Sequence, residues 1–195
     1  MRIIAGDFKG IGLFLPKDKK IRPLKDMVRE NIFNFLTHSN EISFSLEQSN
    51  VLDLYSGTGS FGLECISRKA EKVVFVEKEK EAEKILQKNI EKLKVKGKTE
   101  IFSDDVFNFI KNHDRIFLES SDKMKFDFIF CDPPFKDTNI NILIELIIKN
   151  SLLKKNGIII LHRNKMTSEK LPIYFKLLDE RMYGISKIVF GRFLD

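Results

Sequence analysis

The chain has 195 residues, of which 43% are hydrophobic, and a formal net charge of +6 at pH 7. This length suits one main domain with a small appendage, and this hydrophobic content suits a folded core. Because no apolar stretch approaches the ~20 residues that cross a bilayer, we expect no membrane-spanning helix.

The N-terminal segment predicts a small structure that precedes the main domain. Residues 2–5 and 11–15 are predicted as two short strands of a hairpin around a Gly-Asp-Phe-Lys-Gly turn. A basic loop covers 17–23, and a helix is predicted from Asp26, as its N-cap, to about Thr37. A polar stretch, 38–50, then leads to the first core strand.

The rest of the chain alternates between apolar runs and helical patterns, which predicts an α/β fold with a mostly parallel, Rossmann-like sheet. Two further strands, 174–179 and 185–192, predict an antiparallel pair at one end of that sheet. The polar insert at 112–125 is predicted to be a surface loop. The expected core elements are strands 51–55, 72–76, 99–103, 126–131 and 157–162 and helices 60–69, 79–95, 106–112 and 139–150.

A glycine-rich turn follows the first core strand, and acidic residues follow the next two. Ser56-Gly57-Thr58-Gly59 leads into a helix, and glycines there let the backbone approach a ligand closely. Glu77, some twenty residues later, suits two vicinal ribose hydroxyls, and Asp105-Val106 follows the third strand. Since the carboxyl ends of parallel strands line one crevice, these groups are expected at one site.

This pattern has simpler interpretations as well. Gly57-x-Gly59-x-x-Gly62 also matches the dinucleotide fingerprint and would then indicate NAD. Asp53 opposes that reading, because its charge would repel a pyrophosphate at the helix start, whereas it suits a cationic ligand such as S-adenosylmethionine. Taken singly, Glu77 fits a solvated strand-end charge and Asp105 fits a helix N-cap.

The most informative motif is Asp132-Pro133-Pro134-Phe135, at the end of the fourth core strand. The prolines remove two backbone donors and fix the local path of the chain. What remains is a set of acceptors beside an aromatic ring, which suits a planar base that carries an exocyclic amine. The alternative is an ordinary Pro-Pro turn that ends a strand.

Together these motifs resemble a class I S-adenosylmethionine-dependent methyltransferase that acts on an amine nitrogen. The N-terminal Arg2-Ile3-Ile4-Ala5-Gly6 and the Arg22-Pro23…Val28-Arg29-Glu30 segment resemble the RsmD family, which methylates the exocyclic N2 of a guanine in bacterial 16S ribosomal RNA. Leu24 and Met27 depart from this family, which usually has Thr and Arg there. The resemblance implies an extension at 1–45 and a methyltransferase domain at 46–195.

The resemblance also implies a role for each site residue. Asp132 and the Pro133 carbonyl would accept hydrogen bonds from the substrate amine, and Phe135 would stack on the base. Glu77 would bind the ribose of S-adenosylmethionine, and Asp105 its adenine amine. The full set expected at the cofactor is Asp53, Tyr55, Gly57, Gly59, Glu77, Asp105 and Val106.

The expected partner is ribosomal RNA or the small ribosomal subunit, docked on the N-terminal segment. Residues 1–29 contain eight basic and three acidic side chains, and phosphate contacts come from basic residues. The candidates are Arg2, Lys20, Arg22 and Arg29. An alternative for Arg29 is an ion pair that only ties the extension to the core.

Two other function classes stay open: an adenine-N6 DNA methyltransferase and a non-catalytic RNA-binding protein of the same fold.

Cys65 and Cys131 lie in apolar runs and are expected to be buried, reduced thiols, which favours the cytoplasm. We expect a monomer and no metal site, with His38, His113 and His162 in structural or surface positions.

Overall fold

The computed structural model describes residues 1–16, 24–39, 45–116, 124–167 and 170–194. Over these residues one seven-stranded sheet has the order β3-β2-β1-β4-β5-β7-β6. Its strands are β1 (Asn50–Leu54), β2 (Lys72–Val76), β3 (Thr99–Phe102), β4 (Phe126–Cys131), β5 (Leu153–Asn164), β6 (Phe175–Tyr183) and β7 (Ser186–Phe193). β1 to β5 pair in parallel, while β7 runs antiparallel to both β5 and β6. The Rossmann-like fold class and the antiparallel C-terminal pair are therefore confirmed.

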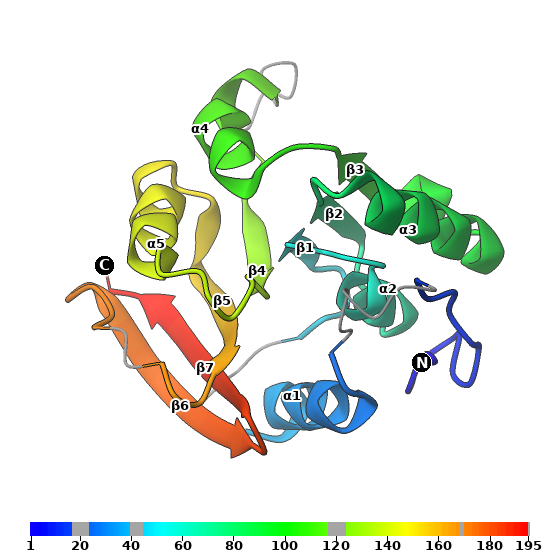
Figure 1. Ribbon diagram of the computed structural model, residues 1–195, viewed down its shortest axis with the longest axis horizontal. Coiled ribbons are helices and arrows are strands. Elements are labelled where there is room, and N and C mark those ends of the chain that lie inside the picture. Colours follow the sequence, from blue (N-terminus) through cyan, green and yellow to red (C-terminus); the bar gives the residue numbers. More distant parts are fainter. Residues whose placement is uncertain (17–23, 40–44, 117–123, 168–169, 195) are drawn as a thin grey trace.

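Helices cover both faces of this sheet (Figure 1). They are α1 (Asp26–His38), α2 (Ser60–Ser67), α3 (Lys80–Leu93), α4 (Val106–Ile116) and α5 (Ile140–Lys149), with a short 3-10 helix at Lys96–Lys98. α1, α2 and α3 pack on one face, and α4 and α5 on the other. Successive strand residues point to opposite faces, so β1 gives Val51 to the first core and Leu52 to the second.

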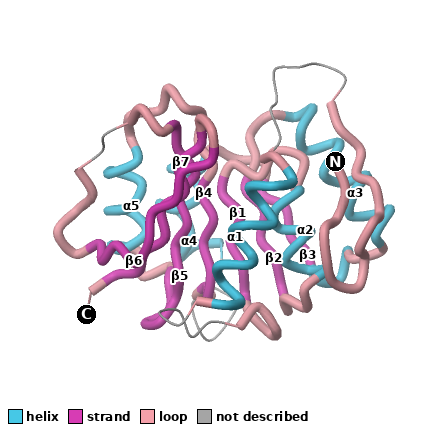
Figure 2. The backbone as a smooth tube through the Cα atoms, turned by 90° about the horizontal axis from the view of Figure 1, so that it is seen from below, coloured by secondary structure: helices cyan, strands magenta, loops and turns pink. Residues whose placement is uncertain are grey.

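The order of the strands determines where a ligand can bind. β2 and β3 lie on one side of β1, while β4 and β5 lie on the other (Figure 2). The connections therefore change direction between β1 and β4. In open α/β sheets a crevice forms at the carboxyl ends of the strands at such a switch point. The glycine-rich turn follows β1 there, and Asp132 follows β4.

The N-terminal hairpin lacks the two strands that we predicted. One antiparallel bridge, Arg2 to Gly12, joins its arms, with a backbone hydrogen bond from Ile3 to Ile11 of 2.9 Å. The reason lies in α2, where the Glu64 carboxylate accepts hydrogen bonds from the backbone N–H groups of Ile4 (2.7 Å) and Ala5 (2.9 Å). Those donors are used to dock the hairpin and do not extend a ladder.

Other boundaries differ from the sequence-based expectations in smaller ways. The N-cap of α1 is Lys25, with no side-chain cap, and Asp26 lies in the first turn. α4 continues to Ile116 and so takes up part of the predicted loop, while β5 begins at Leu153. Cys65 and Cys131 are buried and free, as expected. Among the described residues no helix combines the length and the apolar character that a bilayer crossing requires.

Candidate active site

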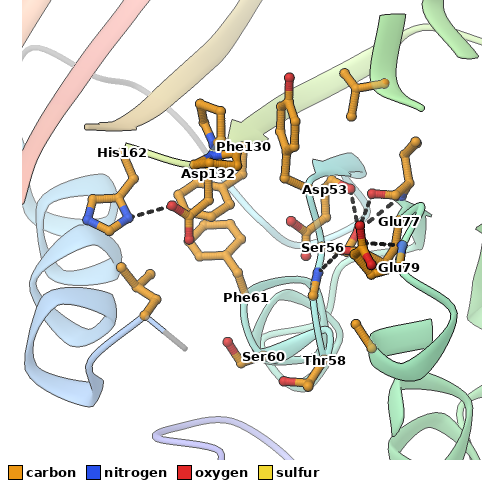
Figure 3. Close-up of a pocket in the computed structure, with 18 of the residues that line it drawn as sticks. Asp53, Ser56, Thr58, Ser60, Phe61, Glu77, Glu79, Phe130, Asp132 and His162 are labelled. Atoms are coloured by element: carbon orange, nitrogen blue, oxygen red, sulfur yellow. Dashed lines mark hydrogen bonds and ion pairs between the residues drawn. The ribbon is translucent and has the colours of Figure 1, made fainter. Parts of the chain in front are cut away.

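A cavity of about 730 Å³ lies at the carboxyl ends of β1, β2 and β4 (Figure 3). It brings together most of the residues that the sequence singled out, although they come from four separate parts of the chain. Those that line it are Asp53, Tyr55, Gly57, Glu77, Val106, Asp132, Pro133 and Phe135. Gly59 and Asp105 are not on its wall, and each has a different local role.

The glycine-rich turn follows β1 with an unusual backbone path. Tyr55, Gly57 and Gly59 all have positive φ, at 61°, 55° and 79°. A Cβ on Gly59 would lie 2.2 Å from Cδ1 of Leu86, so this glycine is needed for α3 to pack against the turn. A Cβ on Gly57 would meet no protein atom within 4 Å. The backbone at Gly57 is therefore open to a ligand, whereas Gly59 supports the turn from behind.

Asp53 is a buried carboxylate at the floor of the cavity. Its side chain is 1% exposed, and its Oδ2 accepts a hydrogen bond from the backbone N–H of Gly62 at 3.0 Å. Burial raises the pKa of Asp53 well above its usual range, and the negative charges of Asp132 and Glu77 raise it further. A cation bound in the cavity would relieve this repulsion, so the floor favours a positively charged ligand.

Glu77, at the end of β2, holds the glycine-rich turn in place. One carboxylate oxygen accepts a hydrogen bond from the backbone N–H of Gly57 at 2.7 Å, and the other from that of Glu79 at 2.8 Å. Each carboxylate oxygen has a second lone pair. Glu77 can therefore support the turn and still accept hydrogen bonds from ligand hydroxyls.

Asp105 caps helix α4. Its Oδ1 accepts a hydrogen bond from the backbone N–H of Phe107 at 2.9 Å, and its Oδ2 lies 3.4 Å from the Lys78 ammonium. The cavity wall at this position is formed by Asp104 and Val106. The N-cap interpretation is therefore correct, and a contact between Asp105 and adenine stays a prediction.

Asp132, directly after β4, forms the other side of the cavity. Its Oδ1 lies 2.7 Å from Nδ1 of His162, on the neighbouring strand β5 (Figure 3). The Phe135 ring meets the His162 ring edge-on, with centroids 5.3 Å apart and planes at 81°. A carboxylate and an aromatic ring thus face the same space, as the motif predicted.

Sequence reasoning missed His162, which it assigned to a structural or surface position. The residue lines the cavity and is 7% exposed. One signal could have identified it: it ends the predicted strand 157–162, and strand ends at the carboxyl edge of a parallel sheet line the ligand crevice.

Arg29 is not a surface residue, so the expectation that it contacts RNA is wrong. Its side chain is fully buried, and its guanidinium donates hydrogen bonds to the carbonyls of Ser60 (3.2 Å) and Arg2. It also pairs with Asp26 at 3.0 Å and lies 4.0 Å from Glu64. Burial lowers its pKa. The alternative, a tie between the extension and the core, is correct.

Of the other residues expected to contact RNA, the structure describes Arg2 alone. The Arg2 side chain is exposed, whereas Lys20 and Arg22 fall outside the described residues.

Among the described residues no group of three or more His, Cys, Asp or Glu side chains is arranged to hold a metal ion.

A family model described as Conserved hypothetical protein 95 matches residues 1–192. The Ribosomal RNA small subunit methyltransferase D of Haemophilus influenzae is 33% identical over 95% of this chain and 90% of its own length. The chain belongs to the RsmD family. The Escherichia coli K12 protein of the same name is 28% identical over 82% of this chain and 72% of its own length.

Solved structures of similar chains share the fold. The yhhF protein of Escherichia coli superposes with a TM-score of 0.80 at 25% identity, covering 99% of this chain and 97% of that one. HI0767 of Haemophilus influenzae gives 0.75 at 31% identity, covering 100% and 98%. SMU.776, solved in complex with SAH, shares the fold at 19% identity and a TM-score of 0.64, over 85% of this chain and 48% of its own.

Proposed function

We propose that this RsmD-family protein transfers the methyl group of S-adenosylmethionine to the exocyclic N2 of a guanine in 16S ribosomal RNA. The observation that carries the proposal is the position of Asp132: its carboxylate lies in one cavity with Phe135 and with the acidic floor around Asp53. Relatives named Ribosomal RNA small subunit methyltransferase D support the choice of substrate.

The cofactor half of the cavity suits S-adenosylmethionine. The buried Asp53 carboxylate favours a cation, and the open backbone at Gly57 allows a close approach. Glu77 retains lone pairs for the ribose hydroxyls. When bound, the cofactor supplies an electrophilic methyl group on a positively charged sulfur.

The substrate half suits a base with an exocyclic amine. The lone pair of a guanine N2 is delocalised into the ring, so this nitrogen is a weak nucleophile. In our proposal Asp132 and the Pro133 carbonyl each accept one N–H, which favours a pyramidal nitrogen and stabilises its developing positive charge. Phe135 stacks on the base and fixes its angle of approach. The N–C bond forms as the S–C bond breaks, and the surplus proton on nitrogen leaves to solvent.

The direct test is methyl transfer from labelled S-adenosylmethionine to small-subunit RNA, followed by mass spectrometry of the nucleosides. The proposal expects N2-methylguanosine. N6-methyladenine in a DNA substrate would support the adenine-N6 alternative, and RNA binding without transfer would support the non-catalytic one.

Two variants separate chemistry from cofactor binding. Asp132→Ala should abolish most turnover and leave the affinity for S-adenosylmethionine intact, because Asp132 faces the substrate. Glu77→Ala should weaken cofactor binding by about 10- to 100-fold, which is the usual loss of affinity when a hydrogen bond to a charged group is removed. Glu77→Gln, which keeps one oxygen, should lose less. Unchanged calorimetric affinity in Glu77→Ala would remove this residue from the cofactor site.

A further inference from the structure

His162 joins the end of β4 to β5 through the Asp132 carboxylate. The two strands are parallel neighbours, with Cys131 beside Leu161, so the residues that follow lie next to each other at the edge of the cavity. The Nδ1–Oδ1 distance is 2.7 Å (Figure 3). The Asp132 side chain keeps 25% of its surface exposed, while the side chain of His162 keeps 9%. One side of the carboxylate is therefore engaged, and the rest remains available to a ligand.

The second nitrogen of the ring is engaged as well. Nε2 of His162 lies 2.8 Å from Oγ of Ser186, the first residue of β7, and Ser186 is 8% exposed. A carboxylate accepts only, so in a neutral imidazole Nδ1–H donates to Asp132 and Nε2 accepts from the Ser186 hydroxyl. The three side chains form one hydrogen-bonded chain across β4, β5 and β7. That chain fixes both the tautomer and the orientation of the ring.

We propose that His162, oriented by Ser186, is a positioning residue for the methyl transfer: it holds the Asp132 carboxylate so that the remaining oxygen faces the substrate amine. This inference rests on the proposed function of the cavity. A surface carboxylate samples several rotamers, and fixing one of them in advance removes an entropic cost from the transition state. The same ring also contacts Phe135 edge-on, so it borders both substrate-facing side chains.

The neighbouring residue, Arg163, supports the next part of the same loop. It is 1% exposed and donates hydrogen bonds to the carbonyls of Pro134 (3.4 Å) and Asp137. Consecutive residues of a strand point to opposite sides. β5 therefore holds the Asp132–Asp137 segment from both sides. His162 contacts the Asp132 side chain, and Arg163 binds backbone carbonyls farther along the segment.

Steady-state kinetics of variants test the inference. His162→Ala should lower kcat by about 10- to 100-fold, because the hydrogen bond it removes is made to a charged group. The KM for RNA and the calorimetric Kd for S-adenosylmethionine should stay within about twofold, since a lost transition-state interaction lowers kcat without changing ground-state binding. His162→Asn should recover much of the rate, because its amide N–H can donate to Asp132. Ser186→Ala should show a smaller loss of kcat.

His38→Ala is the matched control, since His38 is an exposed histidine at the end of α1, outside the cavity lining. It should behave like the wild type. Wild-type kcat in both His162→Ala and Ser186→Ala would overturn the inference, and so would a loss confined to cofactor affinity. If His162→Ala does not fold, His162→Asn and Ser186→Ala still decide the outcome.

The hydrogen-bonded chain can be tested without turnover. In ¹⁵N NMR of the neutral imidazole, we expect the proton of His162 on Nδ1, and the Asp132→Ala variant should shift this signal. A proton on Nε2 in the wild type would overturn the inference. Absence of methyl transfer by the wild-type protein would instead refute the proposed function, so the two failures are distinguishable.

Discussion

Three of the carboxylates that line the cavity, Asp53, Glu77 and Asp132, have different hydrogen-bond partners, and these partners determine their chemistry. Asp53 is buried with one backbone N–H, Glu77 accepts two backbone N–H groups, and Asp132 meets an imidazole. Their mutual repulsion contributes to the raised pKa of Asp53. Desolvation and like charge both disfavour the ionised form of Asp53, so a cation beside this carboxylate would stabilise it.

Asp53→Asn should therefore have opposite effects on stability and on binding. Because burial raises the pKa of Asp53 above its value in the unfolded chain, the native state holds the proton more tightly, and the stability contributed by this group falls as pH rises above about 4. Asn carries no charge and can still accept from Gly62. At a pH near 8 the ligand-free variant should melt no lower than the wild type, yet bind S-adenosylmethionine more weakly.

Thermal melts across about pH 4 to 8 and calorimetry measure these two effects. The difference in melting temperature between variant and wild type should grow with pH. Equal cofactor affinity in the two proteins would show that Asp53 does not face the bound cation.

The loop after β4 is the element that distinguishes the two halves of the cavity. Its first residue, Asp132, is fixed by β5, and its aromatic residue, Phe135, is half-buried against His162. The loop after β1, by contrast, is supported by Glu77 and by the packing of Gly59 on α3. In the proposed function, the loop after β4 contacts the base and the loop after β1 contacts the cofactor.

Phe135→Tyr should keep substantial methyl transfer, and Phe135→Ala should lose most of it. The reason is that a base stacked on an aromatic side chain gains about 1–3 kcal/mol, which either ring supplies. The measurement is kcat/KM for RNA with cofactor affinity as the control. Full activity in the Ala variant would mean that Phe135 serves packing only.

Helix α1 is tied to the rest of the molecule through Arg29. This guanidinium reaches Arg2 in the extension and Ser60 at the start of α2, while Glu64 of α2 also pairs with Arg68 at 2.9 Å. The extension and the cofactor-side helix are therefore joined by one buried network. Such a network is costly to break, because partners left behind are buried without compensation.

Arg29→Met should lower the free energy of unfolding by about 3 kcal/mol, since it leaves buried acceptors unpaired. Denaturant unfolding measures this loss, and Arg29→Lys, which keeps the charge but not the planar fork, should recover only part of it. In the folded variant the salt dependence of RNA binding should match the wild type. A shallower salt dependence would restore Arg29 as a phosphate contact.

At the scale of the whole molecule, the excess positive charge is concentrated near the N-terminus. Residues 1–29 carry eight basic and three acidic side chains, against a net charge of +6 for the entire chain. Arg29 is buried, so it does not add to the surface. Lys25 lines the cavity and is exposed, which puts part of this basic segment beside the cavity.

Neutral replacements of Lys17, Lys19, Lys20 and Arg22 should weaken RNA binding and make it less dependent on salt. Each lost phosphate contact should reduce the slope of log affinity against log salt by about 0.7 for single-stranded RNA. Binding of S-adenosylmethionine should be unchanged. If RNA affinity and its salt slope both match the wild type, the docking surface lies elsewhere, and the loop after Phe135 becomes the next candidate.

Much of this architecture follows from local sequence patterns. The apolar runs and the glycine-rich turn predicted the strands β1 to β5 and the helices α2 to α5 to within a few residues, because periodicity and turn chemistry act over short distances. The antiparallel pair β6 and β7 was predicted in the same way. The placement of Asp53, Glu77 and Asp132 at one cavity followed from a rule about strand ends, and the structure agrees.

Only the tertiary structure determined the contacts between elements that are distant in sequence. His162 meets Asp132 across 30 positions, and Arg29 meets Ser60 across 31. Strand register and helix docking determine such pairs, and no local pattern specifies either. The same reason explains the hairpin: two short runs around a Gly-Asp-Phe-Lys-Gly turn predicted strands, but the Glu64 carboxylate accepts hydrogen bonds from the backbone N–H groups of Ile4 and Ala5. The sequence by itself thus determined the kinds of groups present at the site, and long-range packing decided which of them touch.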